Sequence, residues 1–325
     1  MARMHDERIP GESVATVMRP AVATLDGAEA MTVTGPDAAS FLHGQLANDV
    51  TGLAVGGARR SLYLNHKGHA VAEVMVLRRG RTAFDLVEEG GAAGWVREEL
   101  VRHVVFDDVT VSSPYAVALQ TVQGEGAAAV VQRALGVEPP GEGTVAVCAP
   151  AGLGEVAVWR RVRSTAGGFD LLADAAAGAA LLAAAAGAGA VPVDAGGRDL
   201  LRVRAGVALA PQDAGDGVLP QEAGLEPALS YRKGCYLGQE IMARIEARGN
   251  LRRGLVRLTL AGDPRAAASG EEGWRELRAG GRVVGRLGTV APSTCGYEAL
   301  AVVRRDLPAS TELVAQGGIL ARVHP

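Results

Sequence analysis

The sequence is poor in aromatic residues, which make up 4% of its 325 residues. Val, Leu and Ala must therefore fill most of the interior, and few side chains can stack on nucleic-acid bases. The net charge of −3 gives no general attraction to polyanions. Direct nucleic-acid binding is therefore not expected.

Cysteine is also scarce. Cys148, Cys235 and Cys295 lie far apart and form no CxxC pair. A disulfide framework, a zinc site and an all-cysteine iron–sulfur site, which needs four thiolates, are therefore not expected, and we predict no metal site. Three unpaired cysteines fit a protein in a reducing compartment. The first residues of the sequence show no signal-peptide pattern. The longest apolar stretch, residues 175–190, is broken by glycines, so we expect a cytoplasmic protein that does not enter a membrane.

Apolar residues make up 48% of the chain and charged residues 21%, so a sizeable core can form. Strands and helices alternate without a regular βαβ rhythm, and no GxGxxG follows a strand, which indicates an α+β fold rather than a dinucleotide-binding one. After residue 250 the strands are short and closely spaced, as is typical of a small barrel. We expect an irregular segment at 1–30, α+β domains at 31–145 and 146–250, and a C-terminal β-barrel domain at 251–325.

Apolar periodicity places the individual elements. A helix opened by Gly35-Pro36-Asp37 should bury Phe41 and Leu42, and further helices are expected at 94–103, 127–135 and within 175–190. The expected strands are 31–34, 61–64, 71–77, 83–87, 116–121, 145–148, 156–162, 169–172, 256–260, 282–284, 286–290, 299–303 and 319–323.

The most distinctive segment, residues 231–240, reads YRKGCYLGQE and suggests a loop followed by a helix that ends at Gly249-Asn250. Glu240 and Arg244 can pair one helical turn apart. The expected buried stripe of this helix is Leu237, Ile241 and Ile245.

Cys235 is expected at the N-terminus of that helix, with Arg232 and Lys233 beside it. Positive potential at a helix end and neighbouring cations stabilise a thiolate and lower its pKa. A reactive thiol is one interpretation of Cys235, and a small buried cysteine is the other.

The segment from Tyr231 to Arg253 is basic. Six lysine or arginine residues stand against two glutamates: Arg232, Lys233, Arg244, Arg248, Arg252 and Arg253 against Glu240 and Glu246. A glutamylated cofactor tail or a phosphate backbone would be attracted to such a segment. A solvated helix face is the simpler interpretation.

The stretch Lys233-Gly234-Cys235-Tyr236-Leu237-Gly238-Gln239-Glu240 resembles the K-G-C-[FYW]-x-G-Q-E signature of YgfZ-type proteins, which are relatives of the glycine cleavage T protein. Other segments resemble the same family: Gly35 to Gln45 with Asp49, Leu64 to Gly68, Leu219 to Leu225, and Gly285 to Asp306. The resemblance covers roughly residues 30–310.

This resemblance implies the multi-domain α+β fold of the T protein, with a central folate-sized cavity and a small C-terminal β-barrel. It also implies binding of tetrahydrofolate or a derivative, and a role in assembling or repairing iron–sulfur enzymes, including some that modify tRNA. The implied partners are a folate-like small molecule and iron–sulfur enzymes or their assembly proteins. The functional thiol would be Cys235, within a motif formed by Lys233, Gly234, Tyr236, Gly238, Gln239 and Glu240. The implied folate-binding residues are Gln45, Tyr63, Asn65, Arg202, Glu222 and Arg244.

The sequence departs from the T protein at two positions. An Asp-Asp pair that takes part in the T protein's chemistry aligns with Ala72-Glu73, which argues against aminomethyl transfer because a displaced carboxylate is poorly positioned. Arg204 replaces a glutamate that contacts the pterin in T-protein relatives, and an arginine can only donate hydrogen bonds. The second change weakens the case for folate.

Three functions remain open. The first, which we favour, is a folate-binding accessory protein that supports iron–sulfur enzymes through Cys235 and need not be an enzyme. The second is a folate-dependent aminomethyltransferase-like one-carbon transferase, for which Glu73 is the nearby carboxylate. The third is nucleic-acid binding through the basic helix.

Overall fold

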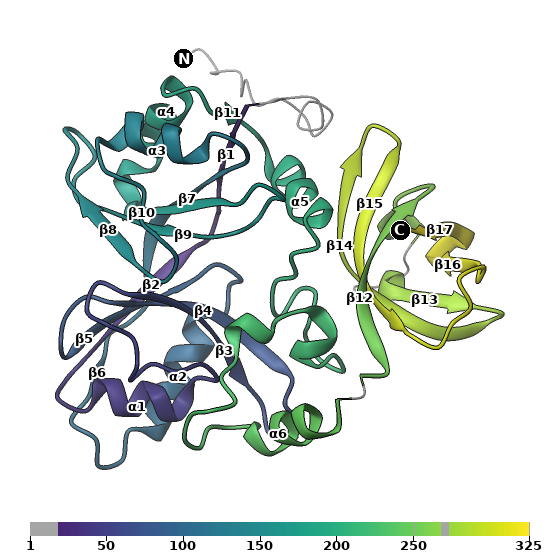
Figure 1. Cartoon of the computed structure of the whole chain (residues 1–325), viewed down its shortest axis with the longest axis horizontal. Helices are drawn as coiled ribbons and strands as arrows, with labels where there is room; N and C mark the ends of the chain where they lie inside the picture. Colours follow the sequence, from purple (N-terminus) through teal and green to yellow (C-terminus); the bar gives the residue numbers. More distant parts are fainter. Residues whose placement is uncertain (1–18, 250, 268–272, 325) are drawn as a thin grey trace.

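The computed structural model describes residues 19–249, 251–267 and 273–324 (Figure 1). They form an eleven-stranded sheet, helices that cover it, and a closed six-stranded barrel. Figure 1 shows the sheet as two halves beside the barrel, with helix α5 (Ala195–Arg204) between the upper half and the barrel. The expected α+β fold with a small C-terminal β-barrel is confirmed.

The large sheet has the strand order β3-β4-β5-β2-β7-β10-β9-β8, while β1 pairs with β7 and β11, and β6 pairs with β2. Its strands are β1 (Ala21–Thr24), β2 (Glu29–Thr34), β3 (Ala58–Leu64), β4 (Ala70–Arg78), β5 (Ala83–Glu88), β6 (Thr110–Val111), β7 (Tyr115–Gln123), β8 (Val145–Cys148), β9 (Val156–Arg160), β10 (Gly168–Asp174) and β11 (Val191–Pro192). The halves meet at β2 and β7, whose register pairs are Glu29–Ala116 and Ala30–Tyr115. Fewer residues pair between β2 and β7 than between β7 and β10. The two halves of the sheet can therefore splay apart beyond this contact.

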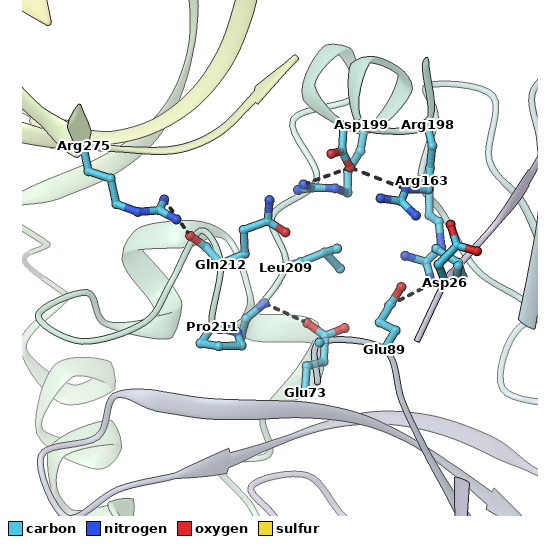
Figure 2. A pocket seen from close by; sticks show the side chains of 14 residues that line it. Asp26, Glu73, Glu89, Arg163, Arg198, Asp199, Leu209, Pro211, Gln212 and Arg275 are labelled. Carbon is cyan, nitrogen blue, oxygen red and sulfur yellow. Dashed lines mark hydrogen bonds and ion pairs between the residues drawn. The ribbon is translucent and has the colours of Figure 1, made fainter. Parts of the chain in front are cut away.

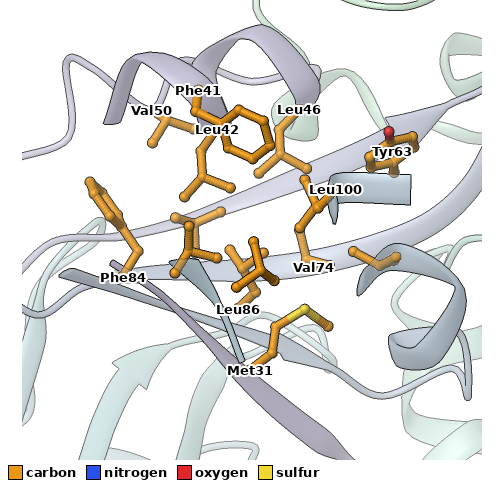
Figure 3. Close-up of a cluster of buried hydrophobic side chains, with 14 of the residues drawn as sticks. Met31, Phe41, Leu42, Leu46, Val50, Tyr63, Val74, Phe84, Leu86 and Leu100 are labelled. Carbon is orange, nitrogen blue, oxygen red and sulfur yellow. The ribbon is translucent and has the colours of Figure 1, made fainter. Parts of the chain in front are cut away.

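Two helices cover the outer face of each half (Figure 1). These are α1 (Ala38–Gln45) and α2 (Ala93–His103) on the first half, and α3 (Ala127–Leu135) and α4 (Gly178–Gly187) on the second. In α1 the buried residues are Ala38, Phe41 and Leu42, at the helical spacing that the sequence predicts. Figure 3 shows Phe41 and Leu42 packed over Val74 and Leu86 of the sheet.

The inner faces of the two halves face each other. Leu77 and Val87 of the first half and Leu119 and Trp159 of the second belong to one buried cluster. Charged side chains fill the rest of this interface, as described below.

The segment after the second half carries α5, two short 3-10 helices, η3 (Pro220–Ala223) and η4 (Glu226–Ala228), and α6 (Gln239–Arg248). Asp194 caps α5, because its Oδ1 accepts the backbone N–H of Gly197 at 2.8 Å. Gly249 ends α6 with φ 60°, a conformation that suits glycine. Within the described residues, the other 3-10 helices are η2 (Ala175–Ala177), η5 (Pro264–Ala267), η6 (Gly273–Arg275) and η7 (Gln316–Gly318).

The barrel closes in the order β12-β15-β14-β13-β16-β17. Its strands are β12 (Arg253–Leu260), β13 (Glu276–Ala279), β14 (Arg282–Ser293), β15 (Gly296–Arg304), β16 (Leu313–Ala315) and β17 (Ile319–Val323). The expected strands 282–284 and 286–290 are one strand, β14, whose pairing with β15 shifts register between Leu287 and Val290. Leu200 and Val203 of α5 pack against Ala291 and Leu300 of the barrel.

Two further expectations need correction. Strand β1 lies inside the segment 1–30 that was expected to be irregular, because pairing with β7 and β11 orders it. The stripe Leu237, Ile241 and Ile245 is not buried as expected: Leu237 is 45% exposed and both isoleucines are half-buried, while Met242 of α6 is fully buried. The domain boundaries at 145 and 250 stay predictions. Within the described chain, no helix combines the length and apolar character needed to cross a membrane.

Candidate functional site

A cavity of about 380 Å³ lies between the two sheet halves, α5 and the loop that follows α5 (Figure 2). Its volume falls within the roughly 300–1,000 Å³ of small-molecule sites. The lining includes the acids Asp26, Glu73, Glu89 and Asp199, the arginines Arg163, Arg198, Arg202 and Arg275, and the apolar residues Leu25, Leu209 and Pro211. This is the mixture of apolar surface and convergent polar groups that a polar organic ligand needs.

Some polar groups at the cavity have no partner within the described chain. The Asp26 carboxylate is exposed and makes no hydrogen bond or ion pair with a described residue. Arg202 is 1% exposed, and its Nε is buried without a hydrogen-bond partner among those residues. Asp199 lies 3.6 Å from Arg198 and from Arg202, too far for a strong hydrogen bond. The cavity therefore offers both acceptors and donors.

Asp213 holds the loop that forms one wall of the cavity. Its Oδ2 accepts Arg202 Nη1 at 2.5 Å and the backbone N–H of Leu209 at 2.9 Å. Its Oδ1 accepts the backbone N–H and the hydroxyl of Thr289 on β14, at 2.6 and 2.8 Å. Gly288 gives Asp213 this approach, because a Cβ there would lie 2.2 Å from Oδ1. One buried carboxylate thus ties the cavity wall, α5 and the barrel together.

Glu73 lies at the base of the cavity and is ion-paired to two arginines. Arg60 binds both carboxylate oxygens, at 2.5 and 2.9 Å, and Arg161 Nη2 lies 2.6 Å from Oε1. Burial acts to raise the pKa of Glu73, but the attraction of Arg60 and Arg161 outweighs it and holds the pKa at about 2. Glu73 is therefore ionised at neutral pH, with both oxygens engaged. A general base needs a pKa near the working pH, so this geometry does not suit Glu73 for that role.

The ion pairs continue across the interface between the sheet halves. Arg163 donates to both oxygens of Asp170, at 3.1 and 2.7 Å, and to Glu89 at 2.9 Å. Burial opposes the charge on Arg163, but Asp170 and Glu89 raise its pKa. Burial and the repulsion of Arg60 together lower the pKa of Arg161 to about 10, which still leaves it a cation at neutral pH.

This network separates the cavity from a second one on the other side. The second cavity, of about 650 Å³, is lined by Arg59, Arg60, Arg160 and Arg161 among other residues. Glu73 lines the first cavity and binds Arg60 and Arg161 of the second. Paired charges thus lie between the two cavities.

The signature segment is attached to the end of α1 by Lys233. Its Nζ donates to the backbone carbonyls of His43 and of Leu46, the latter at 2.6 Å, and lies 4.4 Å from the centre of the Tyr236 ring. Burial lowers the pKa of Lys233 to about 8, against the opposing attraction of Asp49 and Cys235. Lys233 therefore holds the motif against the first half of the sheet.

Cys235 does not lie at the helix end. Helix α6 begins at Gln239 with Gly238 as its N-cap, so Cys235 precedes the cap by three residues. Gly238 has φ 83°, and a Cβ there would lie 2.9 Å from the carbonyl oxygen of Asn65, so contact with this turn places the start of the helix. The Cys235 side chain is exposed.

Exposure predicts the order in which the cysteines react. Under native conditions, iodoacetamide should modify Cys235 and Cys295, which are exposed, before Cys148, whose thiol pKa is raised by burial. Mass spectrometry of tryptic peptides over a time course measures this, and the same reaction in urea, where the rates should converge, is the control. Modification of Cys148 as fast as Cys235 in the folded protein would contradict the structure.

The six residues implied as folate ligands lie in different places. Arg202 lines the 380 Å³ cavity, while Tyr63 OH lies 3.4 Å from Gln45 Oε1, next to α2. Asn65 closes its own turn by accepting the N–H groups of Lys67 and His69. Glu222 pairs with Arg253 at 2.6 Å, and Arg244 forms the predicted pair with Glu240, at 3.5 Å on the surface. Of the six implied folate ligands, the structure thus brings Gln45 and Tyr63 together and leaves the others apart.

Arg204 does not line the cavity. It reaches Glu298 of β15, with Nη2 at 2.5 Å, and its carbonyl accepts Arg257 Nη1 at 2.9 Å. The arginine therefore joins α5 to the barrel rather than placing a cation where a ligand would bind. Arg204 therefore places no cation in the 380 Å³ cavity.

Among residues 19–249, 251–267 and 273–324, no group of three or more His, Cys, Asp or Glu side chains is arranged to hold a metal ion. His69 instead pairs with Asp216 at 3.0 Å, and His43 with Asp49 at 3.1 Å.

Comparison with known proteins assigns the family. Residues 5–233, well over half of the chain, match the family described as the GCVT N-terminal domain. The chain belongs to this GCVT family. The matched region ends at Lys233, so the rest of the signature segment and the barrel lie outside it.

Individual relatives agree with the GCVT assignment. The aminomethyltransferase of Cupriavidus taiwanensis is 33% identical over 190 residues, which cover 53% of this chain and 50% of that protein. The aminomethyltransferase of Bacillus cytotoxicus is 31% identical over 101 residues, or 31% of this chain and 28% of that protein. The chain thus spans about half, or less, of the length of these curated relatives.

The fold of the GCVT relatives extends through the barrel. The crystal structure of the glycine cleavage system aminomethyltransferase T from Bartonella henselae matches with a TM-score of 0.75 and 22% identity, over 95% of this chain and 86% of that one. At this identity the likeness establishes the fold.

Sequence reasoning missed most of the cavity. Asp26, Glu89, Arg163, Arg198 and Asp199 stood in no recognised motif. The closely spaced arginines of the RRVR stretch at 160–163 were the one local signal, because a run of arginines after a buried strand needs carboxylate partners.

Proposed function

We propose that this protein binds a reduced folate, tetrahydrofolate or a derivative, in the 380 Å³ cavity. The observation that carries the proposal is the buried Nε of Arg202, which has no hydrogen-bond partner among the described residues, at a cavity that the exposed Asp26 carboxylate also lines. A pterin edge carries both N–H donors and oxygen and nitrogen acceptors, so it needs both kinds of group. Leu25 and Leu209 supply apolar surface for the ring faces.

The residues present fit such a ligand. Asp26 and Asp199 would accept hydrogen bonds from the pterin, while Arg198 and Arg202 would donate. Arg198 is held in place by a hydrogen bond from Nη1 to the carbonyl of Thr24, at 3.1 Å. Membership of the GCVT family and the resemblance to folate-binding YgfZ-type proteins support the same ligand class.

Folate-dependent one-carbon transfer is the activity that the family supports better than an accessory role, since the relatives described above are named aminomethyltransferases. A bound folate would supply the one-carbon carrier. In this chain Glu73 is ionised and engaged by Arg60 and Arg161, so we assign it to shaping the cavity. Asp26 and Asp199 are the carboxylates left to take a proton.

The accessory role in iron–sulfur enzyme assembly or repair is a separate proposal. It is supported by the exposed Cys235 and by the resemblance of residues 233–240 to the YgfZ-type signature. Cys235→Ala should fail to complement a strain that lacks its own YgfZ-type protein, while Cys295→Ala, which removes another exposed thiol, should complement. Full rescue by Cys235→Ala would remove this thiol from the mechanism.

Tetrahydrofolate titration tests the ligand. Calorimetry under anaerobic conditions should show saturable binding, and Asp26→Asn should weaken it about tenfold, the usual effect of losing a hydrogen bond to a charged group. Asp107→Asn, the same change on a loop outside the cavity, is the matched control. Absence of binding at ~1 mM tetrahydrofolate, an affinity too weak for a cofactor, would refute the proposal.

Formation of methylene-tetrahydrofolate from an aminomethyl donor then separates the two functions. Turnover that is lost in Asp26→Asn or Asp199→Asn supports transfer. Tight folate binding without turnover at high protein concentration supports a binding role alone.

A further inference from the structure

The barrel carries an unusual arrangement of like charges next to α6. Arg253 of β12 and Arg304 of β15 are direct register partners, and each has an arginine neighbour, Arg252 and Arg305. Like charges directly opposite each other on paired strands are destabilising. Four arginines that converge from two distant parts of the chain need carboxylate partners or an external anion.

Carboxylates partner two of the four arginines. Arg253 donates to both oxygens of Glu222, at 2.9 and 2.6 Å, and Arg304 donates to both oxygens of Asp306, at 2.9 and 2.5 Å. Arg305 donates from Nε to the backbone carbonyl of Arg253 at 3.0 Å and has no carboxylate within ion-pair distance among the described residues. The Arg252 backbone carbonyl accepts the N–H of Arg305 at 2.9 Å, but the Arg252 side chain makes no hydrogen bond or ion pair with any residue that the structure describes. Neither Arg252 nor Arg305 is thus hydrogen-bonded to a carboxylate among the described residues. The pKa of Asp306 is lowered mainly by its hydrogen bond from Arg304, and the charge of Arg252 adds to this effect.

These arginines line a cleft of about 830 Å³ between α6, η3 and the barrel. The other lining residues, apart from the two acids, are the half-buried aliphatic side chains Leu219, Ile245 and Leu251. Among the described residues that line the cleft there is no aromatic side chain on which a base could stack. It shares no lining residue with the 380 Å³ cavity and is a separate site.

We propose that this arginine cleft binds a small phosphorylated organic molecule, with its phosphate on Arg252 and Arg305 and its apolar part against Leu219, Ile245 and Leu251. Guanidinium groups bind phosphate oxygens through paired, charge-assisted hydrogen bonds. Aliphatic surface beside two arginines that lack a hydrogen-bonded carboxylate favours an amphipathic anion over a simple ion. Two such arginines match one or two phosphate groups rather than a long polyanion.

The test compares inorganic phosphate with n-hexyl phosphate by calorimetry on the full chain. Hexyl phosphate should bind at least about tenfold more tightly, because its chain can contact the aliphatic residues. The double variant Arg252→Gln, Arg305→Gln should bind both probes at least tenfold more weakly than the unchanged protein does. Arg322→Gln, which removes an exposed arginine from β17 of the same barrel, is the matched control and should bind as the unchanged protein does.

Specific outcomes would overturn this proposal. They are equal binding by the double variant and the unchanged protein, no detectable binding of either probe at ~5 mM, or a short RNA duplex that binds far more tightly than hexyl phosphate. Unchanged melting temperatures of the variants show that the fold is intact. The unchanged protein, the double variant and Arg322→Gln should bind tetrahydrofolate equally well. The outcome of the phosphate test is therefore independent of the folate proposal.

Discussion

Glu73→Gln is expected to lower the free energy of unfolding by roughly 3 kcal/mol, which corresponds to a carboxyl pKa held at about 2 instead of its usual 4.5. The substitution keeps the shape of the side chain but leaves Arg60 and Arg161 facing a neutral amide. Arg161 is 6% exposed and cannot turn to solvent for compensation. Breaking a buried ion pair by removing one partner typically costs about 3–5 kcal/mol. Urea unfolding at pH 7 measures the change.

Glu155→Gln is the matched control. Glu155 also pairs with an arginine, Arg79, but its side chain is 60% exposed. An exposed pair contributes at most about 1 kcal/mol, so this variant should unfold nearly as the unchanged protein does. If Glu73→Gln were as mild as Glu155→Gln, the buried network would not be stabilising the interface between the sheet halves.

The same prediction has a pH dependence with a defined sign. The folded-state pKa of Glu73 is depressed, so its contribution is fully present above the unfolded pKa of 4.5 and is lost as the pH falls from there toward 2. The difference in unfolding free energy between the unchanged protein and Glu73→Gln should therefore shrink between pH 5 and pH 3. A difference that stays constant over this range would show that Glu73 does not titrate as the structure requires.

Asp213→Ala is expected to cost about 3–5 kcal/mol of stability, because it leaves the buried Arg202 without its carboxylate. The backbone N–H of Leu209 and both donors of Thr289 lose their acceptor as well. Thermal or urea unfolding measures the loss. Asp263→Ala, which removes a local pair with Arg265 at the barrel surface, should have a much smaller effect.

Asp213→Ala should also loosen the cavity wall. The loop from Leu209 to Gln212 lines the 380 Å³ cavity and is tied to α5 and β14 through Asp213. Limited proteolysis should therefore cut this loop faster in the variant under conditions where most molecules are folded. Asp213→Asn keeps one acceptor oxygen, so its cleavage rate should lie between those of Asp213→Ala and the unchanged protein. Equal cleavage rates in Asp213→Ala and the unchanged protein would mean that the loop is positioned by other contacts.

Local sequence patterns predicted most of the elements that carry the fold. The hairpin of β3 and β4 and strand β17 lie where alternation of apolar residues placed them. Helix α5 was missed, because its first turn contains two glycines and its buried side includes the charged Arg202. Strand β1 was missed because a four-residue strand has too short a pattern to recognise without its partners.

The candidate site was harder to predict. Arg204 was interpreted by alignment as facing the ligand, yet it pairs with Glu298, which lies 94 residues further along the chain. Cys235 was expected at a helix end, but contact between Gly238 and the turn at Asn65 moves the helix start to Gln239. In both cases a distant segment decided the position, and local pattern carries no information about that segment.

The sequence by itself determined the α+β class, the C-terminal barrel and a resemblance that led to the family, because apolar periodicity and motif spacing are properties of neighbouring residues. Only the tertiary structure decided which charges meet. Glu73 joins Arg161 from 88 residues away, and Asp213 reaches Thr289 across 76 residues. Any of the chain's acids and arginines can pair in principle, and burial at the interfaces of the two sheet halves and the barrel selects among them.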